Sequence, residues 1–317
     1  MAHLASFHPQ LSPAQPAAQR EPSQRLAGGG MFWNPGIGLG AGIVLELAGD
    51  IDSLSQRIAE LPGHAAGGRP MVTQYLFMVK TLAAAWTTRS RPGMHAALDG
   101  LRHLGDGLLA YDAPQLTTAL LNMAHGKPSS GPGAVRLIDA LVRRLAAPSE
   151  ALSALDQDVA NYLAQMGRAS GQLETDTVLA TQRLQADHVH AFILAQQVDT
   201  LQGRLADARA RQVAITAEAV HLQGLLPTLA AYLRGMDRIG AGIRIAAAGT
   251  RSLRAELDEL KNVLLAGPGA SAAAHAQLEA AVPAWRLLAA RIAAFPPARL
   301  DRQRADQDAR RDSNIAS

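Results

Sequence analysis

The feature that most constrains this chain is a hydrophobic repeat with spacings of three, four and seven residues. It runs from Leu173 to Leu226 without a proline, and such heptad spacing is typical of helices that pack along a continuous seam. The seam positions are Leu173, Ala180, Leu184, Ala191, Leu194, Val198, Leu201, Leu205, Ala208, Ile215, Ala219, Leu222 and Leu226. A single helix over this range would be roughly 80 Å long at 1.5 Å per residue. We therefore predict a helical rod.

The same spacing resumes after Pro227 and predicts a second long helix that folds back on the first. Its seam positions are Leu229, Tyr232, Met236, Ile239, Ile243, Ala246, Leu253, Leu257, Leu260 and Leu264. Aromatic residues make up only 4% of the chain, which suits thin, closely packed helix interfaces rather than a thick globular core. The predicted fold class is all-α, an elongated antiparallel helical bundle with two long coiled-coil-like helices.

Proline and glycine divide the rest of the chain into shorter predicted helices. These cover about 41–61, 72–86, 98–108, 116–123, 135–166 and 278–295. We expect Pro92 and Gly93 to break the second of them, and Pro148 to start or kink a helix. A turn at Gly267 precedes the last helix, which should end before Pro296.

Composition shifts along the chain suggest four segments. Residues 1–30 are rich in Pro, Gln, Ala and Ser and predict a disordered leader. Residues 31–70 hold an apolar, glycine-rich segment and the first helix, and residues 71–297 the elongated helical bundle. Residues 298–317 mix Arg with Asp and predict a charged, flexible tail.

Charge and cysteine content exclude several classes of function. The net charge is +3 and the basic residues are interleaved with acids, so we expect no nucleic-acid partner. The chain has no cysteine, which excludes disulfides, thiolate metal sites and cysteine nucleophiles. Prolines interrupt the N-terminal region where a Sec signal peptide would be apolar, so export should use another route. No window approaches eighteen uninterrupted apolar residues, so we expect no constitutive transmembrane helix.

The search for catalytic or ligand-binding motifs finds none that holds. The glycines of 36–42 nominally fit a dinucleotide fingerprint, but no strand precedes them. His188 and His190 are two residues apart on a predicted helix, which separates their side chains by about 200° rather than directing both at a metal. We predict no enzyme activity, no catalytic, cofactor-binding or metal site, and no cofactor.

The apolar stretch from Phe32 to Leu45 is the first candidate for membrane insertion. An aromatic pair precedes it, which suits a membrane interface, and Gly36 and Gly40 are four residues apart, a spacing that permits close helix approach in lipid. The candidate residues are Phe32, Trp33, Ile37, Leu39, Gly40, Ile43 and Val44. The alternative is a flexible lead-in that packs Trp33 on the bundle.

A second glycine-rich stretch, from Leu225 to Gly249, supplies secondary insertion candidates, namely Ile239, Ile243 and Ile245. Charged residues such as Arg234 and Asp237 interrupt it. The alternative interpretation is an ordinary helix with small residues at a tight helix crossing.

The order of these elements resembles that of the α-helical pore-forming toxins, which include cytolysin A, the haemolysin BL and non-haemolytic enterotoxin components and the xenorhabdolysin-type binary toxins. The resemblance covers about residues 71–295 and is one of architecture and rhythm. It rests on early helices around Trp86 and Tyr111, the stretch Leu116–Leu120, heptads from Val135 to Tyr162, the long rod, a returning helix with Leu253, Leu257, Leu260 and Leu264, and a closing helix with Trp285, Leu288 and Phe295.

In that family a five-helix tail bundle carries a head between two long helices, and an apolar tongue of the head enters the membrane. The corresponding position here, around 224–249, has no tongue of some twenty apolar residues. The resemblance therefore implies either a partner component of a multi-subunit toxin or a member that inserts Phe32–Leu45.

These observations lead to two hypotheses of function. The first is a component of a bacterial α-helical pore-forming toxin, secreted without a Sec signal peptide, that assembles on the lipid membrane of a target cell as a homo- or hetero-oligomer with related helical subunits. The second is a non-lytic, cytoplasmic helical scaffold, a secretion-apparatus accessory or an adaptor protein, which would use the same rods without membrane insertion.

Overall fold

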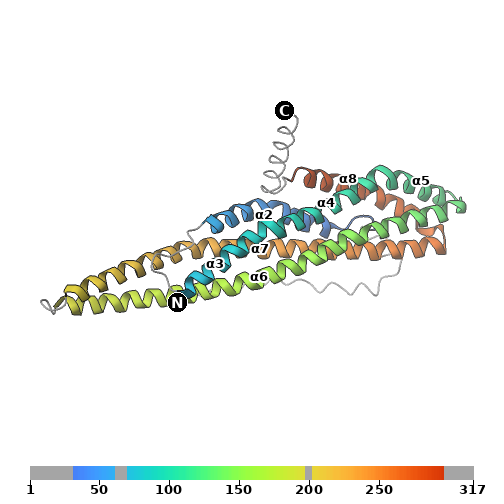
Figure 1. Cartoon of the computed structure of the whole chain (residues 1–317). Coiled ribbons are helices and arrows are strands. Elements are labelled where there is room, and N and C mark those ends of the chain that lie inside the picture. The colour runs from blue at the N-terminus through green and yellow to red at the C-terminus, as the bar shows by residue number, and fades with distance from the viewer. Residues whose placement is uncertain (1–30, 61–69, 197–201, 296–317) are drawn as a thin grey trace, which may run out of the picture.

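The computed structural model describes residues 31–60, 70–196 and 202–295, and every element in these ranges is helical. The longer elements are α2 (Pro35–Glu60), α3 (Pro70–Ala85), α4 (Arg91–Gly107), α5 (Ala113–Ala124), α6 (Gly131–Gln196), α7 (Gln202–Ala266) and α8 (Ser271–Ala293). The short ones are η2 (Trp86–Ser90), η3 (Leu108–Asp112), η4 (Pro128–Ser130) and η5 (Pro268–Ala270). Figure 1 shows an elongated bundle built along the antiparallel pair of α6 and α7. The predicted fold class is confirmed.

The turn between the two long helices is not where the sequence places it. The α6 helix ends at Gln196 and α7 begins at Gln202, whereas Pro227 lies inside α7. The prediction of one helix over 173–226 with a turn at Pro227 is therefore wrong. The heptad spacing runs through both helices, and an apolar period alone does not reveal a reversal of chain direction. A proline removes one backbone hydrogen bond, which the packing around a long helix compensates.

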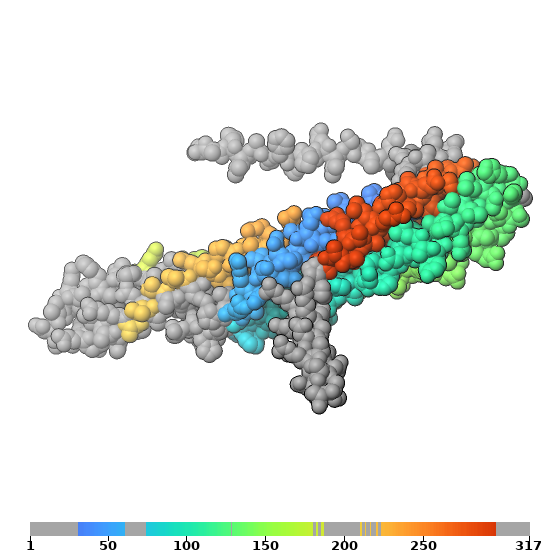
Figure 2. Space-filling model, turned by 90° about the horizontal axis from the view of Figure 1, so that it is seen from above, coloured from blue at the N-terminus to red at the C-terminus, as the bar shows by residue number. Residues whose placement is uncertain are grey.

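The ends of α6 and α7 that flank 197–201 project beyond the other helices (Figure 1). The remaining helices pack along the opposite part of this pair. The α2 helix lies on α7 and α3, whereas α8 lies on α4 and α5. Figure 2 shows α2, in blue, beside α8, in orange-red, on one face of the molecule. The stretch 224–249 thus lies within the body of α7, so its assignment to the head position of the toxin family is wrong.

The seam predicted for the second long helix is confirmed in full. Each of its ten positions is buried, and Leu257 is only 1% exposed. On the first seam, Leu173 is buried and Leu226 is partly buried. The other positions from Ala180 to Leu222 lie outside the side chains that the structure describes.

The first helix starts six residues earlier than predicted. Asn34 accepts a hydrogen bond from the Gly36 backbone N–H through its Oδ1, at 2.9 Å, which satisfies one of the free donors at the helix start. Pro35 follows as the first helical residue, where its missing N–H costs nothing. The Asn-Pro pair was the signal for this start, and the glycines after it masked the signal because glycine disfavours helices.

The predicted break at Pro92 and Gly93 is absent. The π-helical turn η2 joins α3 directly to α4, and η3 joins α4 to α5 in the same way. Each π-turn comes just before a proline, Pro92 or Pro114, near the start of the next helix. A π-turn widens the helix by one residue, which accommodates the ring and the lost donor of a proline without ending the helix.

Three further expectations concern Pro148, the last turn and the two ends of the chain. Pro148 lies inside α6 and does not start a helix. Gly267 and η5 form the expected turn before α8, which ends at Ala293. The leader (1–30) and the tail (298–317) lie outside the described residues.

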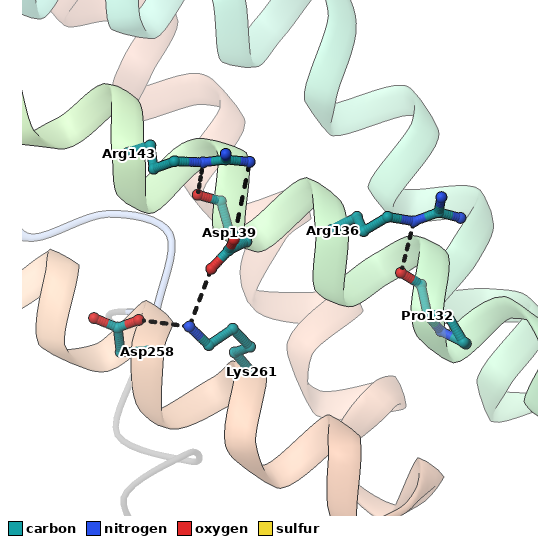
Figure 3. A network of polar contacts seen from close by, with 6 residues as sticks. All are labelled: Pro132, Arg136, Asp139, Arg143, Asp258 and Lys261. Carbon is teal, nitrogen blue, oxygen red and sulfur yellow. Dashed lines mark hydrogen bonds and ion pairs between the residues drawn. The ribbon is translucent and has the colours of Figure 1, made fainter.

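Ion pairs at one end of the rod join α6 to α7 (Figure 3). The Lys261 ammonium donates to Asp139 of α6 and to Asp258 of its own helix, at 3.1 Å each. The hydrogen bond to Asp139, and after it the one to Asp258, raises the pKa of Lys261. Asp139 also pairs with Arg143 on α6. The network fixes the register of the two long helices from the surface.

Candidate functional site

The two glycine-rich stretches considered as membrane candidates pack against each other. The first forms the N-terminal half of α2 and the second the middle of α7, and the two helices are in contact over a long stretch. The tight helix crossing that was the alternative for the second stretch is therefore present, and its partner is the first stretch.

At the crossing the two backbones touch with no side chain between them. A Cβ atom placed on Gly40 would lie 2.5 Å from the backbone nitrogen of Ala246 and closer still to the carbonyl oxygen of Gly242. A Cβ on Gly242 would in turn lie 2.9 Å from the carbonyl oxygen of Gly40. Only glycine fits these two positions, because real Cβ contacts are longer than 3 Å. This is the physical reason for glycines in an otherwise helical segment.

One helical turn towards the start of α2 the same kind of contact recurs. A Cβ on Gly249 would lie 2.8 Å from the backbone nitrogen of Ile37 and 3.1 Å from Asn34 Oδ1. The Asn34 side chain that caps α2 therefore also lies against α7. The close approach thus extends from the first turn of α2 to Gly40.

The structure places most of the insertion candidates against protein. Phe32, Ile37, Gly40 and Val44 are buried, whereas Trp33 and Ile43 are partly exposed. Leu39 is 60% exposed and points away from the bundle. Among the secondary candidates, Ile239 and Ile243 are buried and Ile245 is partly exposed. Of the first set, Ile37, Gly40 and Ile43 thus lie at the contact with α7, the helix that carries the secondary candidates.

Two tryptophans fasten the start of this segment to α8. The Trp285 indole donates its Nε1–H to the carbonyl oxygen of Phe32 at 2.6 Å. The Trp33 ring meets Trp285 edge to face, with ring centroids 5.1 Å apart. The packing of Trp33 on the bundle matches the alternative proposed for this segment, although the segment is helical from Pro35 rather than a flexible lead-in.

No helix in the described part of the chain is long and apolar enough to cross a membrane. Contact of Ile37 or Val44 with lipid would require α2 to separate from its neighbours, because both side chains are buried. Membrane insertion of this segment stays a prediction.

The C-terminal half of α2 is held differently, by polar side chains. The Asp52 carboxylate accepts hydrogen bonds from Trp86 Nε1 at 2.8 Å and from Arg91 Nε at 3.1 Å. One turn later, the Ser55 hydroxyl donates to the carbonyl oxygen of Ala83 at 2.6 Å. Trp86 is the first residue of the π-turn η2 and Arg91 directly follows it, and both side chains reach Asp52 of α2.

A tyrosine pair lies next to this cluster and joins α6 to α7. The hydroxyls of Tyr162 and Tyr232 are hydrogen-bonded to each other, and Tyr162 also donates to the carbonyl oxygen of Leu82 at 2.9 Å. Burial raises the pKa of Tyr162, and burial together with the neighbouring Tyr162 raises the pKa of Tyr232. Both phenols are therefore neutral in the folded chain at ordinary pH.

Sequence reasoning missed this polar group. Asp52, Trp86 and Arg91 follow no known motif, and Tyr162 and Tyr232 were placed on seams only as apolar positions. Arg91 lies between the helices predicted over 72–86 and 98–108, so the helical period gave no signal for it.

The described residues show no sign of metal chemistry. They contain no group of three or more His, Asp or Glu side chains that could hold an ion. The side chains of His188 and His190 lie outside the described ones, so that expectation is not tested. The site that the structure describes is an interface between helices.

The fold is similar to that of known toxin components. The structure of the HblL1 toxin component of Bacillus cereus is 8% identical in sequence, with 81% of this chain and 94% of that chain covered and a TM-score of 0.53. SmhA of the tripartite α-pore-forming toxin Smh from Serratia marcescens is 10% identical, with 84% and 95% covered and a TM-score of 0.45. A head mutant of AhlC, from the tripartite toxin AHL of Aeromonas hydrophila, is 12% identical, with 80% and 98% covered and a TM-score of 0.41.

The chain shares its fold with HblL1. The alignment covers nearly all of that protein, so the likeness is one of whole architecture rather than of a single hairpin. No protein-family model matches the sequence, and no curated protein is similar enough to match.

Proposed function

We propose that the chain is a component of a bacterial α-helical pore-forming toxin that acts on a target membrane. The observation that carries this proposal is the fold shared with the HblL1 toxin component over 94% of that protein. At 8% identity the likeness fixes the fold, so the assignment of function is ours.

The proposal includes a non-enzymatic role and assembly with related helical subunits. Secretion by a route without a Sec signal peptide would bring the protein to the target cell. A long antiparallel hairpin that projects from a compact bundle supports this role, because it offers side surfaces on which similar rods can align (Figure 1).

We further propose that the segment from Phe32 to Val44 contacts lipid after α2 leaves α7. The segment has no charged residue, and its hold on α7 is a close backbone contact without interlocking large side chains at Gly40 and Gly242. At about thirteen residues it is too short to span a bilayer alone, so shallow insertion or a pore shared among subunits is expected.

Dye release from vesicles tests the toxin proposal. Vesicles of phosphatidylcholine and cholesterol are mixed with the chain alone and with any similar helical chains encoded next to its gene. We expect dye release with at least one combination. A chain that neither releases dye nor sediments with vesicles in any combination would instead favour the non-lytic scaffold.

The absence of native cysteine allows a direct test of the inserting segment. Leu39→Cys carries an environment-sensitive fluorophore on the outer face of α2, where the side chain is 60% exposed. Leu287→Cys on α8, 63% exposed, is the matched control. We expect vesicles to shift the emission to the blue at position 39 and not at position 287. Dye release without a response at position 39 would assign the pore to another segment.

Leu39→Asp provides a second test, in which dye release is measured in a variant that keeps its fold. The side chain is exposed, so helicity should not change, whereas dye release should fall if the segment enters lipid. Leu287→Asp should leave dye release unchanged. Substitution of Gly40 cannot serve this purpose, because any side chain there disrupts the crossing with α7.

A further inference from the structure

A buried arginine of α4 lies between α2 and the end of α8. Arg91 is 1% exposed, its Nε donates to Asp52 of α2, and its guanidinium carbon lies 4.1 Å from the centre of the Phe295 ring. Phe295 is the second residue after α8 and also lies against the ring of His95, at 6.0 Å between centroids. We name Asp52, Trp86, Arg91 and Phe295 the Arg91 junction.

A buried guanidinium is stable only when its charge is compensated. Two of the groups that compensate Arg91 come from separate parts of the chain: the Asp52 carboxylate of α2 and the face of the Phe295 ring. The ring lies over the guanidinium, which is 1% exposed, and shielding a charge from water strengthens its attraction to a partner such as Asp52. The two contacts therefore support each other.

Phe295 directly precedes the C-terminal segment of the chain, so a change in that segment can act on the contact between Phe295 and Arg91. Pro296, Pro297 and the charged segment 298–317 follow it directly. Phe295 itself is 9% exposed, and a backbone hydrogen bond of 3.0 Å to the carbonyl oxygen of Ile292 holds it just past the end of α8. A force or a partner that acts on the segment after Phe295 would pull on this ring first.

We propose that Arg91 couples the end of α8 to α2, so that displacement of Phe295 loosens the C-terminal half of α2 from the bundle. The coupling goes beyond the proposed function and does not rest on it, because it operates in the soluble chain and needs no membrane. It assigns a conformational role to a contact between residues 243 positions apart, Asp52 and Phe295, that both touch Arg91.

Hydrogen exchange of the full chain tests the coupling. Phe295→Leu keeps an apolar side chain but removes the ring from Arg91. We expect the amides of residues 50–60 to exchange about ten-fold faster, which corresponds to ~1.4 kcal/mol of opening free energy. Phe295→Tyr retains the ring face and should match the parent chain. Leu287→Ala, an exposed change on the same helix, should leave α2 unchanged.

A double-mutant cycle separates coupling from general loosening. In an Asp52→Asn background the ion pair is already broken, so Phe295→Leu should change exchange in residues 50–60 by less than about two-fold. An Arg91→Met background should give the same result, whereas Arg89→Met, at an arginine that is 79% exposed, should leave the ten-fold effect intact.

Two results would overturn the proposal. In one, Phe295→Leu speeds exchange only in α8. In the other, Phe295→Leu raises the exchange rates of residues 50–60 by the same factor in the Asp52→Asn background as in the parent chain, so the two contacts act independently. Circular dichroism checks that each variant is folded. If Phe295→Leu does not fold, Phe295→Met, which also lacks a ring, takes its place in the same cycle.

Discussion

The α7 helix packs against its two main neighbours in opposite ways. Against α2 it presents glycines, and the backbones approach until no side chain fits between Gly40 and Gly242. With α6 it is joined by large side chains, of which the hydrogen-bonded pair Tyr162 and Tyr232 is one. The contact with α2 is therefore made between backbones, and the contact with α6 is made between large side chains.

The two kinds of contact should lose stability through different amino-acid substitutions. A contact between backbones has no side chain that can rotate away, so an added atom must separate the helices. A contact between side chains loses stability when atoms are removed, since a cavity remains. The two interfaces should therefore be sensitive to opposite kinds of substitution.

The largest effect is expected where an atom is added to the backbone contact. Gly40→Val should lower the free energy of unfolding by about 3 kcal/mol, because its Cβ would overlap the Gly242 carbonyl and the Ala246 nitrogen. Urea denaturation followed by circular dichroism measures the loss. Gly49→Ala is the matched control on α2: nothing lies within 4 Å of its Cβ, so it should stabilise the helix by up to ~1 kcal/mol. Equal losses at both glycines would contradict the crossing.

Removal of atoms from a buried seam should cost slightly less. Leu257 of α7 is 1% exposed, and Leu257→Ala should lower the free energy of unfolding by about 2 to 3 kcal/mol. Leu265→Ala on the same helix, at a side chain 65% exposed, should change it by less than about 0.5 kcal/mol. Similar losses at the two positions would place the seam on the wrong face of α7.

The heptad pattern predicted the class of fold and one seam in detail because apolar spacing reports which face of a helix is buried. It could not place the end of α6 at Gln196 and the start of α7 at Gln202, since both helices share the same spacing. The expected turn at Pro227 and break at Pro92 relied on proline as a helix breaker, and tertiary packing in one case and a π-turn in the other override that rule.

The candidate site shows a similar limit. The sequence marked both glycine-rich stretches as unusual, and spacing of small residues predicted close helix approach. It did not reveal that the two stretches are each other's partner, because their contact joins residues about two hundred positions apart. Small residues four apart indicate a tight crossing equally in lipid and in a protein interior, so the spacing alone does not distinguish the two.

The tyrosine pair gives the side-chain interface a dependence on pH that the glycine contact lacks. Both phenols have a folded pKa above the unfolded value near 10. Their stability is therefore fully present below pH 10 and is lost as the pH rises towards the folded values. At pH 11 we expect a loss of about 2.7 kcal/mol for the pair relative to pH 9.

The double variant Tyr162→Phe/Tyr232→Phe should lose much less stability between pH 9 and pH 11, measured by urea denaturation at each pH. Lys261 contributes a loss of the same sign in both proteins, since its pKa is also raised, so it cancels in the comparison. Tyr111→Phe, at a side chain 69% exposed, is the control and should keep the full alkaline loss. An unchanged loss in the double variant would contradict a buried neutral pair.

The smallest effect concerns the one glycine of the α2 contact that faces a side chain rather than a backbone. A Cβ on Gly235 would meet the terminal Cδ1 of Ile51, which has no backbone constraint. Gly235→Ala should therefore cost about 1 kcal/mol, and Ile51→Val alone about 1 kcal/mol. Combined, the two should cost less than their sum by roughly 1 kcal/mol, because valine lacks the atom that the new methyl displaces.

The same design at the backbone contact should give no rescue. Ala246→Gly removes the one side-chain atom near a Cβ on Gly40, but the Gly242 carbonyl and the Ala246 nitrogen remain in place. Gly40→Ala/Ala246→Gly should therefore be at least as unstable as Gly40→Ala. Denaturation of both double variants compares the two kinds of contact directly. Rescue at Gly40 would mean that the helices can separate there at little cost, and that the distinction between the backbone and side-chain contacts of α7 does not hold.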